Sequence, residues 1–166
     1  MGELLILFAL TGAALVFSWR WIGLGALVLL TCRGAIYCRT SLTDPLTGLG
    51  NLRRLDQQRR KYARAASLRV WYLDLDGLKS VNDTRGHRAG DALLCALASE
   101  LKAVPGADGY RVGGDEFLLI APGDGPAELP RAGALRASWG ASQGPGRALD
   151  DLIRLAEEDM YRKKQG

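Results

Sequence analysis

The stretch RVGGDEFLLI, from Arg111 to Ile120, carries two glycines and two carboxylates directly into a string of large apolar residues. Glycine tolerates positive φ, so the Gly-Gly pair favours a tight two-residue hairpin turn. The apolar run after it has the β-rich content of a core strand. We therefore expect Asp115 and Glu116 at the edge of a sheet. Taken alone, the pattern is equally typical of a solvated turn. Only residues elsewhere in the chain that come close to Asp115 and Glu116 can distinguish a functional site from such a turn.

A second acidic pair lies in LRVWYLDLD, from Leu68 to Asp76, which reads as a buried strand that becomes charged at its carboxyl end. Asp74 and Asp76 therefore stand at a strand tip. Further strands are expected at about 109–112, 116–121 and 134–140. Helices are expected at about 51–66, from 91 to about 104 and at about 149–164, with 77–91 as a loop and the start of the second helix.

This order of elements suits an α+β fold of the ferredoxin-like type, in which helices cover one face of a four-stranded antiparallel sheet. The first and third strands are then neighbours, so Asp74 meets Asp115 and Glu116. Three carboxylates at one edge repel one another unless a divalent cation lies between them. Hard oxygen ligands of this kind suit Mg²⁺, which proteins usually hold together with substrate phosphates.

The first forty residues differ in composition from the rest. From Leu4 to Leu30 the chain is apolar except for Thr11, Ser18 and Arg20, which is far more than the apolar stripe of a soluble helix. We expect this segment to lie in a membrane, either as one tilted helix or, with a slight preference, as a hairpin of two short helices that turns around Arg20. A buried hairpin of a soluble fold is the weaker alternative.

Two further features bear on that segment. The start MGE is acidic and no clear small-residue cleavage site follows, which disfavours a cleaved signal peptide. Arginines crowd its downstream side, so the positive-inside rule places the remainder in the cytoplasm. We expect a membrane anchor and juxtamembrane helix over residues 1–40 and one folded domain over residues 41–166.

Charge and cysteine content set weaker bounds. The 22 Lys and Arg residues exceed the 18 Asp and Glu residues, giving a net charge of +4 that hints at phosphate ligands or an anionic membrane. Cys32, Cys38 and Cys95 are odd in number and lack metal-site spacing, so neither a disulfide framework nor a zinc site is supported.

Several motifs, taken in order, resemble those of the GGDEF domain family, the diguanylate cyclases that join two GTP molecules into cyclic di-GMP. They run from DPLTGLGN through LDLDGLKSVNDTRGHRAGD and GGDEF to SWGAS and AEEDMYRKK, and they cover the chain from Asp44 almost to its end. The resemblance implies the nucleotidyl-cyclase palm, a ferredoxin-like sheet with helices. A lone GGDEF would be weak evidence, whereas this ordered set is strong.

The resemblance also implies roles for matching residues. Asp115 and Glu116 would be catalytic, Asp115 by assisting deprotonation of the attacking 3′-hydroxyl. The implied ligands of Mg²⁺ or Mn²⁺ are Asp74, the Leu75 carbonyl, Asp115 and Glu116.

The implied substrate contacts involve four other residues. Asn82 and Asp91 would read guanine, while Lys79 and Lys164 would contact phosphates. Local alternatives remain for three of them: an Asx-turn for Asn82, a helix N-cap for Asp91 and a solvated helix end for Lys164. His87 reads as a structural residue of the loop rather than a base.

One site of this kind binds one GTP, so the resemblance implies a homodimer at the inner, cytoplasmic membrane of a bacterium, with the domain in the cytoplasm. Its partners would be GTP, the membrane and downstream cyclic di-GMP effectors, and no nucleic acid polymer. The alternative is a catalytically silent GTP-binding receptor, or a dimerisation partner of another GGDEF protein.

Three departures from the family pattern qualify these expectations. Val104 and Ala107 stand where many members carry an Arg-x-x-Asp inhibitory site, so no inhibitory site is expected. The connection between strands three and four, PGDGPAELPRAG, is too short for a second crossover helix, so a sheet face should lose cover and expose apolar residues. The sequence reaches Gly166 without the arginine that usually follows the last helix, and phosphate affinity should suffer.

Overall fold

The structure, a computed structural model, describes residues 31, 42–125, 129 and 137–165. The chain divides into two units, Met1–Thr40 and Ser41–Gly166, and all the described residues except Thr31 belong to the second. The expected membrane segment, residues 4–30, lies outside the described residues. Within them, no helix combines the length and the apolar character needed to cross a membrane.

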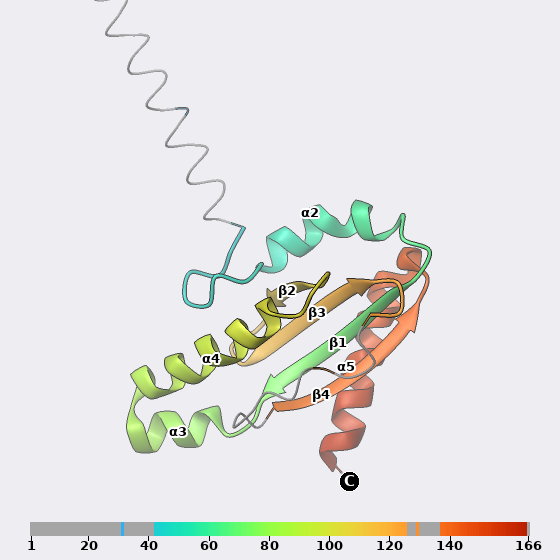
Figure 1. Ribbon diagram of the computed structural model, residues 1–166. Helices are drawn as coiled ribbons and strands as arrows, with labels where there is room; N and C mark the ends of the chain where they lie inside the picture. Colours follow the sequence, from blue (N-terminus) through green and yellow to red (C-terminus); the bar gives the residue numbers. More distant parts are fainter. Residues whose placement is uncertain (1–30, 32–41, 126–128, 130–136, 166) are drawn as a thin grey trace, which may run out of the picture. The chain divides into compact units, whose positions relative to one another are not determined.

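Four strands form one sheet in the second unit (Figure 1). They are β1 (Leu68–Leu75), β2 (Asp108–Arg111), β3 (Glu116–Pro122) and β4 (Ala137–Gly144). The order across the sheet is β2-β3-β1-β4, and every neighbouring pair is antiparallel. The expected pairing of the first and third strands is therefore confirmed. The last strand ends at Gly144 rather than near residue 140, so its predicted end was wrong.

The helices differ more from expectation. They are α2 (Leu52–Tyr62), α3 (Leu78–Arg85), α4 (His87–Lys102) and α5 (Leu149–Gln165), with a 3₁₀ turn at Gly146–Ala148. The loop predicted in the first part of 77–91 is wrong, because those residues form α3, whereas the helix start predicted in the same segment is confirmed by α4, which begins at His87 after Gly86, where φ is +80°. None of the α3 side chains is buried, so hydrophobic periodicity gave no signal for this helix.

Successive side chains of each strand point to opposite faces of the sheet. The strands therefore contribute to two separate hydrophobic cores, one on each face. On one face, Leu73 and Phe117 pack with α4 residues such as Leu97. On the other face, Val70 and Leu118 pack with residues of α2 and α5. The expectation that helices cover only one face is therefore wrong, and Figure 1 shows α4 and α5 on opposite sides of the sheet.

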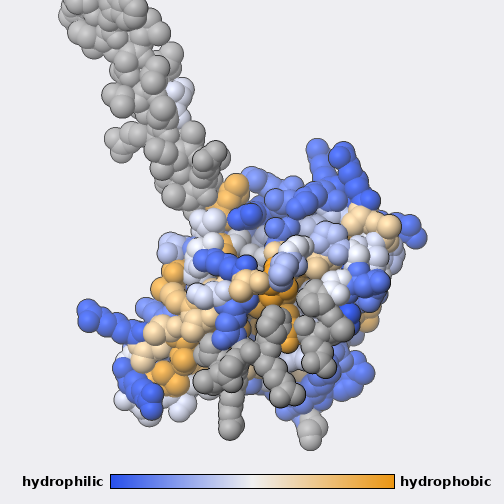
Figure 2. Space-filling view, in the orientation of Figure 1, coloured by the Kyte–Doolittle hydropathy of each residue, from blue (hydrophilic) through white to orange (hydrophobic). Residues whose placement is uncertain are grey.

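Helix α2 has one buried side and one strongly polar side. Asn51 caps its first turn by accepting a hydrogen bond from the Arg54 N–H, at 3.1 Å. Leu55 and Tyr62 are buried beneath the helix. Its outer side carries mostly charged residues, and Figure 2 shows hydrophilic side chains projecting over it.

The short connection between β3 and β4 does not leave the neighbouring sheet face bare. Leu129 is 9% exposed and packs in the same cluster as Trp71 and Ala121. The Trp71 side chain is fully buried, at 0% exposure. The expected loss of cover is wrong at this position, although Trp139, on the same face, is only partly buried.

Candidate active site

The turn that begins β3 differs from the expected two-residue hairpin. The Val112 N–H donates to the Glu116 carbonyl at 3.0 Å, so three residues, 113–115, make the loop. Neither of its glycines has positive φ. Gly113 is favoured for a different reason: a Cβ at that position would collide with Oε2 of Glu116 and lie 3.1 Å from its Cβ. The Glu116 side chain therefore lies against the Gly113 backbone.

The acidic residues of β1 and β3 lie side by side. Asp74 and Glu116 are Cα partners across the two strands. The Leu75 N–H donates to the Asp115 carbonyl at 3.0 Å, which ties the turn to the end of β1. Strand alternation places Asp74 and Glu116 on the same face as Tyr72, the face covered by α5. Burial of Tyr72, together with the nearby Glu116 carboxylate, raises the pKa of its phenol.

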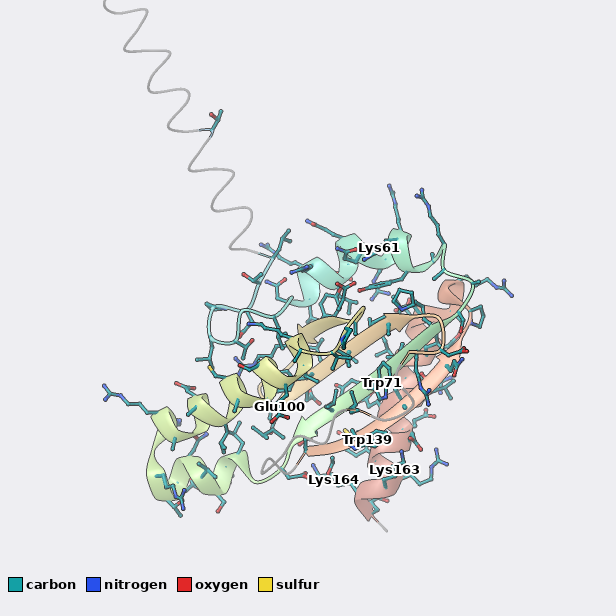
Figure 3. All side chains as sticks on the ribbon, viewed as in Figure 1. Lys61, Trp71, Glu100, Trp139, Lys163 and Lys164 are labelled. Atoms are coloured by element: carbon teal, nitrogen blue, oxygen red, sulfur yellow. The ribbon has the colours of Figure 1, made fainter. Side chains whose placement is uncertain are left out.

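A lysine from the last turn of α5 meets this acidic edge. The Lys164 Nζ lies 3.1 Å from Asp74 Oδ1 and 3.2 Å from Asp76 Oδ1. The Ser138 hydroxyl donates to the Asp76 carboxylate at 2.9 Å and so holds it at the end of β1. Burial lowers the pKa of Lys164, but the two carboxylates outweigh that effect and leave it raised. Figure 3 shows Lys164 at the end of α5, close to the edge of the sheet.

The expected metal ligands fit a hard divalent cation by their chemistry, since carboxylates and a backbone carbonyl supply only oxygen donors. Their arrangement is less complete. Over residues 42–125, 129 and 137–165, no group of three or more acidic, histidine or cysteine side chains is placed to hold a metal ion. The Lys164 ammonium instead supplies the positive charge beside Asp74. The metal site therefore stays a prediction.

A pocket of about 430 Å³ opens on the other side of the same edge. Four of the predicted site residues line it together, namely Lys79, Asn82, Asp91 and Asp115. Helices α3 and α4 supply the first three, and the turn before β3 supplies the fourth. Asp91 lies inside α4 rather than at its N-cap, so the capping alternative is wrong. His87, expected as a loop residue, is the first residue of α4 and also lines the pocket.

Asn82 presents an unsatisfied acceptor at this pocket. Its Oδ1 is buried and has no hydrogen-bond partner among the described residues. Gly90 packs directly against it, because a Cβ at Gly90 would collide with that oxygen. A buried carbonyl oxygen without a partner costs roughly 1–3 kcal/mol, and a ligand N–H at this position would recover that energy. The N–H groups of a guanine base supply such donors.

An arginine that sequence reasoning had taken only as a strand residue connects the turn to the start of the domain. The Arg111 guanidinium donates to the Gly114 carbonyl at 2.6 Å and pairs with Asp44 at 3.2 Å. Burial raises the pKa of Asp44, but hydrogen bonds from Thr47 and the Arg111 charge outweigh it and leave the pKa lowered. The loop after the N-terminal unit is thus fixed to the GGDEF turn.

Three contributors were missed at the sequence level: Arg111, Asp76 as a partner of Lys164, and Gly90 as support for Asn82. Asp76 was predicted at the tip of a strand. The sequence around it gave no sign of an ion pair with Lys164, which follows about ninety residues later. Gly90 and Arg111 act through contacts between elements, which a single sequence does not record. The placement of Asp74 opposite Glu116, in contrast, followed from strand order.

Comparison with known proteins gives one family and several relatives. The family described as "Diguanylate cyclase, GGDEF domain" matches residues 41–133. An uncharacterized protein from the hutH 5′ region of Streptomyces griseus is 38% identical over an alignment of 155 positions, and the match covers 76% of this chain and 63% of that protein. The diguanylate cyclase DgcP of Pseudomonas aeruginosa is 43% identical over an alignment of 89 positions, and the match covers 49% of this chain and 13% of DgcP.

A solved structure shares the fold. The coiled coil and GGDEF domain of DgcB from Caulobacter crescentus, in complex with c-di-GMP, superposes with a TM-score of 0.74. The sequence identity is 23%, and the match covers 86% of this chain and 90% of that one. The chain spans less than two thirds of the length of the two curated relatives described above.

Proposed function

The chain belongs to the GGDEF domain family, and from that premise we propose that it is a diguanylate cyclase that condenses two GTP molecules into cyclic di-GMP and two pyrophosphates. The observation that carries the proposal is the register of the sheet. It sets Asp74 opposite Glu116 and ties Asp115 to the end of β1. The relative DgcP, which is named a diguanylate cyclase, supports the same reaction.

Each condensation is a nucleotidyl transfer. The 3′-oxygen of one GTP forms a bond to the α-phosphorus of the other, and the bond from that phosphorus to the bridging oxygen of pyrophosphate breaks. The proton of the 3′-hydroxyl goes to the Asp115 carboxylate. A second transfer with the roles exchanged closes the ring. Holding the two reacting groups in line supplies a large part of the rate, because it removes the entropy of their encounter.

The remaining roles divide between the two sides of the sheet edge. Asn82 and Asp91 bind the guanine edge in the pocket, and Lys79 binds phosphate there. Lys164 leaves its carboxylate partners and pairs with phosphate when the nucleotide binds. Asp74, Glu116, the Asp115 carboxylate and the Leu75 carbonyl would hold Mg²⁺ or Mn²⁺. The bound cation would polarise the α-phosphate and neutralise the charge of the leaving pyrophosphate.

One domain of this kind presents one nucleotide, so the active species in this proposal is a homodimer. The apolar segment over residues 4–30 would anchor both copies in a bacterial inner membrane with their domains in the cytoplasm. Tethering raises the local concentration of the two half-sites. The product would act on cyclic di-GMP effectors, and no nucleic acid polymer is involved.

A catalytically silent GTP receptor, or a dimerisation partner of another GGDEF protein, is the second candidate. The contact that favours it is the ion pair of Lys164 with Asp74, which neutralises an expected metal ligand. Incubation of the full chain with GTP and Mg²⁺, followed by chromatography and mass identification, separates the candidates. A cyclase yields cyclic di-GMP, whereas a receptor or dimerisation partner yields none; GTP binding measured by dialysis then identifies a receptor.

A further inference from the structure

Helix α2 and the two residues after it concentrate the positive charge of this chain. Leu52 to Arg64 contains six basic residues and one acidic residue, a charge of +5. The whole chain carries +4, so the rest of the sequence together carries −1. The excess of positive charge therefore belongs to this one short surface element.

The six basic residues of this element differ in their surroundings, and one of them, Arg54, is only partly exposed. Arg59 pairs with Asp56 at 2.9 Å and with Asp150, and Lys61 pairs with Asp108 at 3.1 Å, so these two stabilise the fold. Arg53, Arg60 and Arg64 are exposed and form no ion pair with any described residue. The part of the domain that the structure describes therefore uses none of these three charges in an ion pair.

The free arginines point away from the core. Arg53 and Arg60 are seven residues apart, about two helical turns, and so lie in one row along α2. Leu55 and Tyr62 have the same spacing, are buried, and lie on the opposite side of the helix. Arg64 lies two residues after the helix end and is also exposed. Figure 2 shows that the surface over α2 is hydrophilic. We call Arg53, Arg60 and Arg64 the α2 arginine row.

We propose that the α2 arginine row docks the domain on the anionic headgroups of a phospholipid surface. A row of unpaired guanidinium groups on a convex helix matches a flat array of phosphates, and each basic residue near an anionic leaflet strengthens association by about fivefold. Exposed aromatic side chains that would stack nucleic acid bases are absent from α2, whose one aromatic residue, Tyr62, is buried.

The position of the row along the chain favours lipid over other anionic partners. The apolar run of the sequence ends at Leu30, and Leu52 begins α2. The intervening residues can extend at most about 70 Å, so α2 lies within reach of any membrane that holds that run. Leu52 is also 52% exposed at the end of the helix nearest to that segment in sequence. An exposed leucine beside a basic row is typical of helices that lie on membrane surfaces.

The test is hydrogen–deuterium exchange of the peptide that spans α2, measured on the full chain with excess nanodiscs. One set of discs contains phosphatidylcholine alone, and the other also contains phosphatidylglycerol. Exchange should be slower only with the anionic discs, and added salt should abolish the difference. The triple variant Arg53→Gln, Arg60→Gln, Arg64→Gln should lower the docked-to-free ratio by on the order of a hundredfold.

The matched control replaces three equally exposed arginines that make no ion pair with the described residues. They are Arg85, Arg88 and Arg147, each changed to Gln, which removes the same charge from other surfaces. This variant should dock like the wild type. Equal loss in both variants would show that net charge alone attracts the domain and would overturn the assignment to α2.

Three other outcomes contradict the proposal. Identical exchange with both kinds of disc removes the lipid surface as partner. Protection by a single-stranded RNA, without protection by anionic discs, assigns the row to nucleic acid. Protection that grows with protein concentration in neutral discs assigns it to a second copy of the chain. Cyclic di-GMP formation in the same samples reports separately on the proposed activity, so failure of one proposal leaves the other measurable.

Discussion

Lys164 and Asp74 form an ion pair across the edge of the sheet, with Nζ and Oδ1 3.1 Å apart. The last turn of α5 thus supplies a positive charge at the end of β1, where the family resemblance implies a divalent cation. A partly exposed pair of this kind contributes about 1 kcal/mol or less. A metal ion that binds Asp74 has to displace the Lys164 ammonium.

Lys164→Met should therefore bind Mn²⁺ more tightly than the wild type in the absence of nucleotide. The expected gain is a few-fold, since removing the ammonium ends its competition for Asp74 and Asp76. Titration of Mn²⁺ followed by electron paramagnetic resonance measures it. Lys163→Met is the control, because Lys163 pairs with Asp159 instead. A weaker or unchanged Mn²⁺ affinity in Lys164→Met would show that the ion pair does not compete with metal.

Gly90→Ala should weaken GTP binding without unfolding the domain. The new Cβ would collide with Asn82 Oδ1 and force that side chain out of the pocket, whereas alanine suits the interior of α4. Loss of one hydrogen bond to guanine corresponds to roughly a tenfold weaker affinity. Equilibrium dialysis with GTP measures the change. Ala92→Ser, on the exposed side of the same helix, should bind GTP normally; equal affinity in all three proteins would remove Asn82 from the site.

Arg111→Gln should lower the free energy of unfolding by about 1–3 kcal/mol at neutral pH, because it removes the link from Asp44 to the Gly114 carbonyl. The folded-state pKa of Asp44 lies below its ordinary value of 3.8. Its pairing therefore stabilises the fold above that pH and is lost as the pH falls through the lowered pKa.

The difference between Arg111→Gln and the wild type should accordingly shrink as the pH drops below 3.8. Urea denaturation at neutral and acidic pH measures it. Arg154→Gln breaks an exposed pair and should leave the stability close to that of the wild type at both pH values. If the Arg111→Gln difference is the same at both pH values, the Asp44 charge is not its source.

Leu129→Ala should destabilise the domain by about 2 kcal/mol, because Leu129 packs in the core cluster that contains Trp71. Leu155→Ala, at a leucine that is 44% exposed, should cost much less. Thermal or chemical denaturation compares the two. Equally small losses of stability in both variants would show that the β3–β4 connection does not cover Trp71. The expectation that this sheet face loses its cover would then be correct.

The pairing of strands was predictable, while the helical layers were not. Nearly continuous apolar runs in β1 and β3 predicted both strands, and the order of elements predicted that Asp74 lies beside Glu116. The segment from Leu78 to Arg85 buries nothing, so periodicity could not reveal α3. Helices on both faces escaped prediction because an apolar side shows that a helix packs on the sheet but not on which face, and α4 and α5 pack on opposite faces.

At the site, residue types were easier to predict than their contacts. Lys79, Asn82, Asp91 and Asp115 were named from motifs, and one pocket brings them together. The two glycines before Asp115 were taken to supply positive φ, but neither has it, and Gly113 instead makes room for Glu116. A steric requirement set by a residue three positions later is invisible in turn propensities. The partners of Lys164 depended on tertiary structure for the same reason.

The proposed cyclase activity is best measured by incubating the full chain with GTP and Mg²⁺ and identifying the nucleotides by chromatography and mass. We expect cyclic di-GMP from the wild type and from Asp151→Asn, an exposed acid far from the pocket, and at least about a hundredfold less product from any variant that lacks the proton acceptor. Asp115→Asn is such a variant, because it cannot accept the 3′-hydroxyl proton. Wild-type protein that binds GTP but forms no cyclic di-GMP, or Asp115→Asn that forms it at the wild-type rate, would contradict the proposed cyclase mechanism.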